Sequence, residues 1–159
     1  MKIVLIPALL LSCLCGCGYS TRSLLPSHIR RVAVVSVTNG TTQPGLAEEL
    51  TDSLYSAFRS DRNLLVTGTD NAELLLSVTL TSYSRVPAVY DAAQSISGYE
   101  LSISASFESD DRLRNEPFTS GQVSARLVYN PNREDEPTAA SRVIGQLSRD
   151  LVRSIITAW

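Results

Sequence analysis

The fold is decided by the stretch Tyr99-Glu100-Leu101-Ser102-Ile103-Ser104-Ala105-Ser106-Phe107-Glu108. Apolar residues occupy its odd positions and polar residues its even positions. Because successive side chains of a β-strand point to opposite faces, this alternation predicts a strand with one buried face and one polar face. Residues 73–83 and 123–128 alternate in the same way, so the pattern predicts antiparallel strands that share one buried face.

Two other stretches carry apolar residues at helical spacing. Leu46, Leu50, Leu54 and Phe58 recur every four residues, and residues 138–158 carry a similar stripe. This spacing predicts two amphipathic helices. The β-branched run 32–37 predicts a strand covered on both faces, and residues 64–67 predict a shorter one. We therefore predict an α+β fold of two layers, with two helices packed on one face of a mostly antiparallel, mixed sheet of four to five strands.

The N-terminus predicts a lipid anchor. An apolar run, residues 3–14, follows Lys2 and is shorter than the roughly 20 residues that span a bilayer. It leads to Leu14-Cys15-Gly16-Cys17, the pattern of a bacterial lipoprotein signal, in which the cysteine receives acyl groups and the chain is cut before it. We expect residues 1–16 to be the signal peptide, residues 17–28 a lipidated tether and residues 29–159 a single domain. A plain signal peptide that happens to contain cysteines, or lipid attachment at Cys13, is the alternative.

Composition and charge exclude some classes of function. All three cysteines lie between positions 13 and 17, so cleavage before Cys17 leaves no thiol for a disulfide. Lys2 is the only lysine, and its removal leaves 13 arginines against 16 acids, a formal net charge of −3. That balance argues against nucleic acid as a partner, because nucleic-acid binding calls for a basic surface.

The sequence lacks the common signatures of catalysis. It has no HExxH motif, no phosphate-binding glycine loop and no serine elbow. His28 is the only histidine and has no acid nearby in sequence, so we expect it at the surface or at a cap. Asp110 and Asp111 are expected to solvate a hairpin turn with Arg112 and Arg114. We therefore expect no enzymatic activity, no metal and no cofactor other than the N-acyl and S-diacylglycerol groups on Cys17.

One face of the predicted sheet and one segment between its strands are unusual. Its outward positions are small and hydroxylated, and this face is either solvated or docked against a polar surface. The positions are Ser77, Thr79, Thr81, Ser102, Ser104, Ser106 and Ser124. The second feature is the semi-apolar segment 85–91, which we expect to be a loop between two strands; as such it either carries function or folds back onto the domain edge.

Several short motifs together resemble the lipopolysaccharide-assembly lipoprotein family (LptE-like). They are Cys17-Gly18-Tyr19, residues 28–34, residues 39–46, residues 83–87, Tyr90-Asp91 and Tyr99. The resemblance implies a lipoprotein of the outer membrane, on its periplasmic face. Its soluble domain would sit inside the β-barrel that translocates lipopolysaccharide, help that barrel to fold, plug it and contact lipopolysaccharide. The implied partners are that barrel, lipopolysaccharide and outer-membrane lipid.

The family contacts lipopolysaccharide through basic residues near loops. Arg85 is the first candidate here, because it ends a predicted strand, and Arg30 and Arg31 are the next. Residues 32–80 also resemble periplasm-facing lipoproteins that regulate an envelope enzyme or oligomerise in a secretion complex. A lipid-anchored hydrolase is a third reading, and it requires clustered carboxylates or a buried His28.

Overall fold

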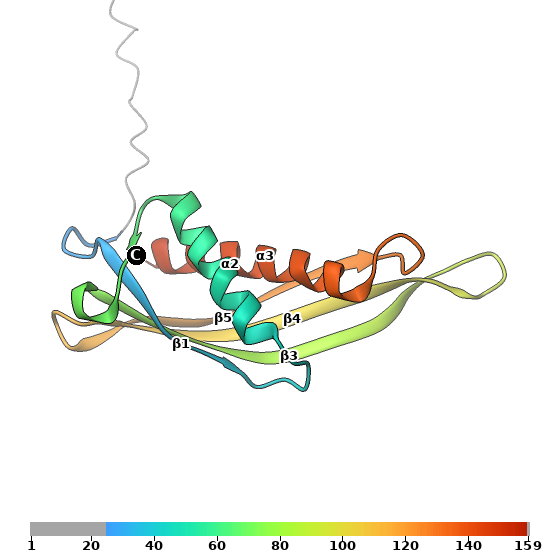
Figure 1. The fold of residues 1–159 in the computed structure, drawn as a ribbon, viewed down its shortest axis with the longest axis horizontal. Coiled ribbons are helices and arrows are strands. Elements are labelled where there is room, and N and C mark those ends of the chain that lie inside the picture. The colour runs from blue at the N-terminus through green and yellow to red at the C-terminus, as the bar shows by residue number, and fades with distance from the viewer. Residues whose placement is uncertain (1–24, 159) are drawn as a thin grey trace, which may run out of the picture.

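The computed structural model describes residues 25–158. One domain of two layers holds all of its helices and strands (Figure 1). In chain order they are β1 (Arg31–Asn39), α2 (Leu46–Asp61), β2 (Leu65–Val66), the short 3-10 helix η2 (Thr69–Asn71), β3 (Leu74–Tyr90), β4 (Ile96–Asp111), β5 (Glu116–Tyr129) and α3 (Glu136–Ile156). The predicted signal peptide and lipid site at Cys17 lie outside the described residues.

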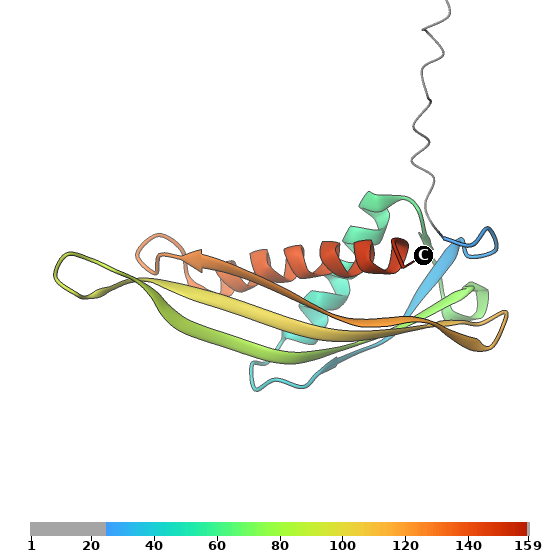
Figure 2. The same ribbon diagram turned by 180° about the vertical axis from the view of Figure 1, so that it is seen from behind.

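The five strands form one mixed sheet in the order β2-β1-β3-β4-β5. β1 runs parallel to β2 and β3, whereas β3, β4 and β5 pair antiparallel as two consecutive hairpins. The sheet curls, and both helices lie on the same side of it, as the two opposite views show (Figures 1 and 2). The predicted α+β fold, with two helices on one face of a mostly antiparallel mixed sheet, is confirmed.

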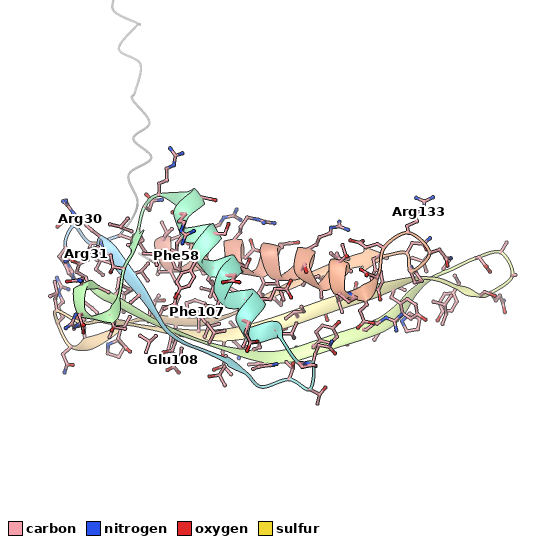
Figure 3. The ribbon with its side chains drawn as sticks, in the orientation of Figure 1. Arg30, Arg31, Phe58, Phe107, Glu108 and Arg133 are labelled. Carbon is pink, nitrogen blue, oxygen red and sulfur yellow. The ribbon has the colours of Figure 1, made fainter. Side chains whose placement is uncertain are left out.

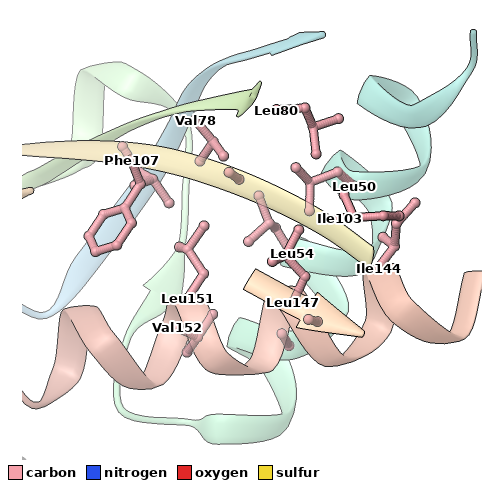
Figure 4. Close-up of a cluster of buried hydrophobic side chains, with 14 of the residues drawn as sticks. Leu50, Leu54, Val78, Leu80, Ile103, Phe107, Ile144, Leu147, Leu151 and Val152 are labelled. Carbon is pink, nitrogen blue, oxygen red and sulfur yellow. The ribbon is translucent and has the colours of Figure 1, made fainter. Parts of the chain in front are cut away.

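The core lies between the helices and the odd-numbered side chains of β4 (Figure 4). Leu101, Ile103 and Ala105 are completely buried there. α2 contributes Leu50, Leu54 and Phe58, and α3 contributes Ile144, Leu147, Leu151 and Ile155, all likewise without exposed surface. Each of these leucine, isoleucine and phenylalanine side chains contributes about 1.5–3 kcal/mol by leaving water. The buried core residues of the described part of the chain run from Ile29 to Ile156.

β3 is longer than predicted, and the expected loop 85–91 is wrong. The strand continues to Tyr90 and pairs with β4 through Arg85–Leu101, Pro87–Tyr99 and Tyr90–Ile96. Pro87 is tolerated because β1 ends at Asn39, opposite Leu80, so within residues 25–158 the other edge of β3 has no partner strand from Ser82 onward. The turn of this hairpin lies between Asp91 and Ser95, where the Asp91 carbonyl and carboxylate accept hydrogen bonds from the turn backbone.

A bulge in β3 explains why the alternation in the sequence did not predict this continuation of the strand. The register with β4 shifts between Leu80 and Ser82, so Thr81 is an extra residue in the strand. Before the bulge the even-numbered residues face the helices; after it Tyr83 and Arg85 do. Thr81, the extra residue, is exposed, as expected for an outward position, and Ser82 and Ser84 continue the outward row opposite Ser104 and Ser102.

Local capping explains where α3 begins. Asp135 precedes the helix, and its carboxylate accepts a hydrogen bond of 3.0 Å from the backbone N–H of Thr138. Pro137 stands in the first turn, where a missing N–H costs nothing. Among residues 25–158, neither helix combines the length and apolarity required to cross a membrane.

We expect Leu147→Ala to lower the free energy of unfolding by about 2–5 kcal/mol, because Leu147 is fully buried and its truncation leaves a cavity between α3 and the sheet. Urea denaturation measures the change. Leu65→Ala is the matched control, because Leu65 is 66% exposed. Its effect should stay within about 0.5 kcal/mol. Equal losses in the two variants would contradict this assignment of the core.

Candidate functional site

Arg85 lies at the centre of a cluster on the helix side of the sheet. Its Nε donates a 2.7 Å hydrogen bond to the hydroxyl of Tyr129, and it lies 3.3 Å from Oε2 of Glu136. Its guanidinium carbon is 3.6 Å from the centroid of the Tyr99 ring, a cation–π contact. The tyrosine rings come from β4 and β5, and the carboxylate from the first residue of α3. These contacts hold the guanidinium in one position.

Glu136 connects this cluster to a second residue of β3. Tyr83 donates a 2.7 Å hydrogen bond to Oε1 of Glu136. Burial and this hydrogen bond to a carboxylate raise the pKa of Tyr83, so its hydroxyl stays protonated and remains a donor. We call Tyr83, Arg85, Tyr99, Tyr129 and Glu136 the Arg85 cluster. It joins all three long strands to the start of α3.

The guanidinium of Arg85 still has donors to offer. Its side chain is 35% exposed. Among the described residues, no hydrogen bond engages its terminal Nη atoms. Arginine remains cationic at any physiological pH, and two of its N–H groups can bind the oxygens of one phosphate or carboxylate. The site can therefore bind an anion with a cation that the protein has already oriented.

Beyond Arg85 the β3–β4 hairpin projects past the helices as an arm (Figure 1). We call residues 86–97 the hairpin arm. Its exposed apolar side chains are Val86, Val89, Tyr90 and Ile96, of which Tyr90 is the most exposed at 58%. Gly98 is buried at its base, where an added Cβ would lie 3.2 Å from Val89, so the two strands approach closely there. An oriented guanidinium beside an exposed apolar arm suits an amphiphilic anion.

The opposite face of the sheet presents the hydroxyl groups. We call the following residues the hydroxyl face: Ser77, Thr79, Ser82 and Ser84 on β3, Ser102, Ser104 and Ser106 on β4, and Ser124 on β5. Register places Thr79 opposite Ser106, and Ser104 lies between Ser82 and Ser124. A hollow of about 460 Å³ opens on this face, between β4 and β5, beside Arg126.

The other two predicted arginines lie at the far end of the domain (Figure 3). Arg31 forms an ion pair with Glu73, which also accepts a 2.7 Å hydrogen bond from the Arg31 backbone N–H. The contact with Arg31 holds the pKa of Glu73 below its ordinary value. Arg30 is exposed, and its Nε donates to the carbonyl of Ser27. β1 begins beside Leu74, eleven residues before Arg85 on β3, a distance of roughly 35 Å. The three arginines do not form one site.

Sequence reasoning missed the contact between His28 and Asp111. His28 Nε2 lies 2.6 Å from Oδ2 of Asp111, whose side chain is only 3% exposed. The two residues are 83 positions apart, so no sequence pattern linked them. Asp111 is therefore not the solvating turn acid that we expected, although it also accepts hydrogen bonds from the backbone N–H groups of Leu113 and Arg114.

Across residues 25–158 no group of three His, Cys, Asp or Glu side chains could hold a metal ion.

Comparison with known proteins identifies one family. Residues 29–158 match the family model described as LptE, Lipopolysaccharide-assembly. No curated protein matches the chain significantly.

Solved structures show the same fold in other proteins. The chain is similar to a point variant of the PelC dodecamer from Paraburkholderia phytofirmans, with a TM-score of 0.57 and 18% identity over 80% of this chain and 89% of that one. It is similar to a hypothetical protein from Chlamydia trachomatis, with a TM-score of 0.61 and 13% identity over 82% and 99%. It is also similar to a lipoprotein from Neisseria meningitidis, with a TM-score of 0.50 and 15% identity over 79% of this chain and 97% of that one. At these identities the likeness concerns the fold alone.

We expect Asp111→Asn to lower the free energy of unfolding by about 1 kcal/mol at pH 7. The substitution removes the buried carboxylate and with it the charge-assisted contact with His28. Burial raises the pKa of Asp111, but hydrogen bonds from His28, Arg114 and Leu113 outweigh that effect and hold it below its usual value.

A carboxyl whose pKa is lower in the folded state stabilises the fold above its unfolded pKa. The difference between wild type and Asp111→Asn should therefore shrink as pH falls below about 4. Urea denaturation at several pH values measures it. A difference that stays constant from pH 7 to pH 3 would contradict the assignment.

Proposed function

This chain belongs to the LptE lipopolysaccharide-assembly family, and from that premise we propose that it is an outer-membrane lipoprotein that contacts lipopolysaccharide and plugs its translocon β-barrel. The observation that carries the proposal is the Arg85 cluster beside the exposed apolar hairpin arm. Lipid acylation of Cys17 is part of the proposal and follows from the signal pattern in residues 1–17.

The chemistry of lipopolysaccharide suits this end of the domain. Its lipid A carries phosphate groups beside acyl chains. In the proposed contact, the Nη atoms of Arg85 bind a phosphate oxygen, and Tyr90 and Ile96 contact the acyl region. The mature chain carries a net charge of −3, so long-range attraction does not draw the anion in. The affinity has to come from the local contact at Arg85 and the arm.

The hydroxyl face supports the second part of the proposal. The interior wall of a membrane β-barrel is polar. A convex sheet face with short hydroxyl side chains can approach such a wall closely and form hydrogen bonds along it. The longer side chains of Glu100, Glu108 and Arg126 share this face with the hydroxyl groups, so the proposed close approach concerns the short side chains around Ser104 and Ser124. A solvated sheet face is the alternative, and it predicts no contact with a barrel.

Arg85→Gln should weaken binding of purified lipopolysaccharide about tenfold, because it removes a charge-assisted hydrogen bond to phosphate. Fluorescence anisotropy with labelled lipopolysaccharide measures the affinity. Arg133→Gln is the matched control: Arg133 is exposed in the loop before α3 and points away from the sheet (Figure 3).

The arm can be tested in the same assay. Ile96→Ser should weaken binding, whereas Leu113→Ser should not, because Leu113 is 67% exposed on the hairpin at the opposite end. If Arg85→Gln binds as tightly as Arg133→Gln while its thermal unfolding is unchanged, Arg85 is not part of the lipopolysaccharide site.

A substitution on the hydroxyl face tests the barrel. We expect the double variant Ser104→Arg and Ser124→Arg to lose co-purification with a large outer-membrane β-barrel, because two long cations would separate the sheet from the wall. The control is Ser56→Arg with Ser141→Arg, which adds the same charge to exposed positions on α2 and α3.

The wild-type pull-down separates the two classes of function. Recovery of a large β-barrel supports the translocon proposal. Recovery of a cell-wall enzyme, or only of further copies of this chain, would overturn it in favour of a periplasm-facing regulator or a secretion component. Equal barrel recovery by both double variants would remove the hydroxyl face from the interface but keep the partner.

A further inference from the structure

We propose that the ends of α2 and α3 form a binding site for the head groups of anionic phospholipids, next to the place where the chain leaves the domain toward its anchor. The inference rests on the proposed lipid on Cys17, which would set this end against a membrane. It concerns a surface that neither the Arg85 cluster nor the hydroxyl face includes.

A cavity between the two helices is the centre of this site. Its volume is about 340 Å³. Arg149, Arg153, Ser60 and Thr157 supply the polar part of its lining, together with the acid Asp61. Its apolar lining, Ala57, Val152 and Ile156, is almost completely buried. Guanidinium and hydroxyl donors above an apolar floor match a phosphodiester attached to a glycerol.

The position of Arg149 is not explained by helix stability. Arg59 and Arg153 lie in the last turns of α2 and α3, where a cation is favourable beside the negative end of the helix dipole. Arg149 lies about two turns before the end of α3, outside that range. It is four residues from Arg153, and two like charges at this spacing repel each other on a helix. An anion bound between the two arginines would remove that repulsion.

The nearby acids do not neutralise the site. Arg153 lies 3.6 Å from Asp150, in an exposed pair of little strength. Among the described residues Arg149 forms no ion pair, and Asp61 accepts hydrogen bonds from Asn63 instead. Arg149 and Arg153 therefore line one cavity whose lining contains a single acid, Asp61.

A second cavity extends the site toward the anchor. It has a volume of about 660 Å³ and lies between residues 25–30 and the chain that follows α2, with Arg30 and Arg62 in its lining. Arg62 has a φ of 63°, the left-handed region that favours glycine. The backbone N–H of Leu65 donates to the carbonyl of Arg30, which joins the two segments. In both views the end of α3, the end of α2 and the start of β1 lie at the same end of the domain (Figures 1 and 2).

The length of chain before the domain limits its distance from the membrane. Cys17 is eight residues before Leu25, and eight residues span at most about 29 Å even when fully extended. The two cavities lie at the end from which this segment leaves. A lipid on Cys17 therefore keeps Arg30, Arg62, Arg149 and Arg153 near the head groups, where each cation attracts an anionic leaflet.

Vesicle binding by the chain from Gly18 onward tests the inference, because this chain carries no acyl group and contains every core residue from Ile29 to Ile156. The probes are vesicles of phosphatidylcholine alone and vesicles that also contain phosphatidylglycerol. We expect binding to the anionic vesicles only, and loss of binding when salt rises to about 1 M, where the Debye length falls to about 3 Å.

The double variant Arg149→Gln and Arg153→Gln should weaken binding to the anionic vesicles about 30-fold, roughly fivefold for each arginine. The control is Arg126→Gln with Arg133→Gln, which changes the net charge equally on the sheet face and at the far end and should cost less than about threefold. Thermal unfolding of each variant checks that the domain remains folded.

Two results would overturn the inference: wild type that binds uncharged and anionic vesicles equally, or the two double variants losing the same affinity. Failure of the proposed function gives a different result. If Arg85 does not bind lipopolysaccharide, Arg85→Gln leaves lipopolysaccharide binding intact, whatever the Arg149 and Arg153 variant does with phospholipid.

Discussion

The structure depends on the packing of the odd-numbered side chains of β4 against the two helices. Among residues 25–158, β4 is the only strand with long antiparallel neighbours on both sides, and its row Leu101, Ile103 and Ala105 is completely buried. This row orients β3 and β5 by their register and lies under α3, whereas α2 lies closest to β1, β2 and α3. The burial of one sheet face also determines that the other face is polar, because side chains alternate along each strand. The hydroxyl face is thus a consequence of the same row.

The two helices do not cover the whole length of the sheet. β3 and β4 continue beyond the start of α3, and the hairpin arm leaves the hydrophobic core there. The Arg85 cluster lies at this boundary. Glu136, the first residue of α3, contacts both Tyr83 and Arg85, so the point at which α3 begins also determines where the guanidinium is held. The lipopolysaccharide contact and the phospholipid contact that we propose lie at opposite ends of the helix layer.

Sequence alone predicted much of the fold and part of the candidate site. The periodicities of residues 99–108, 46–58 and 138–158 are local, and each appears in the structure as the expected strand or helix. Arg85 was selected as the end of a strand; it lies inside one, yet beside the arm, and its role in lipopolysaccharide binding stays a prediction. Arg30 and Arg31 were grouped with it because all three are basic residues near predicted loops. Roughly 35 Å of strand separates them from Arg85.

The sequence by itself determined the class of the fold and the composition of each sheet face, because alternation and helical spacing follow from backbone geometry within a few residues. The family was indicated separately, by the resemblance of its short motifs. Tertiary structure alone decided which distant residues meet. The bulge at Thr81 turned Tyr83 and Arg85 toward Tyr129 and Glu136, and the pairing of strands placed His28 beside Asp111 across 83 residues. It also brought Arg149 and Arg153 beside the α2 end and the segment that leads to Cys17. Such contacts depend on register and on the orientation of packed layers, and neither leaves a local pattern in the chain.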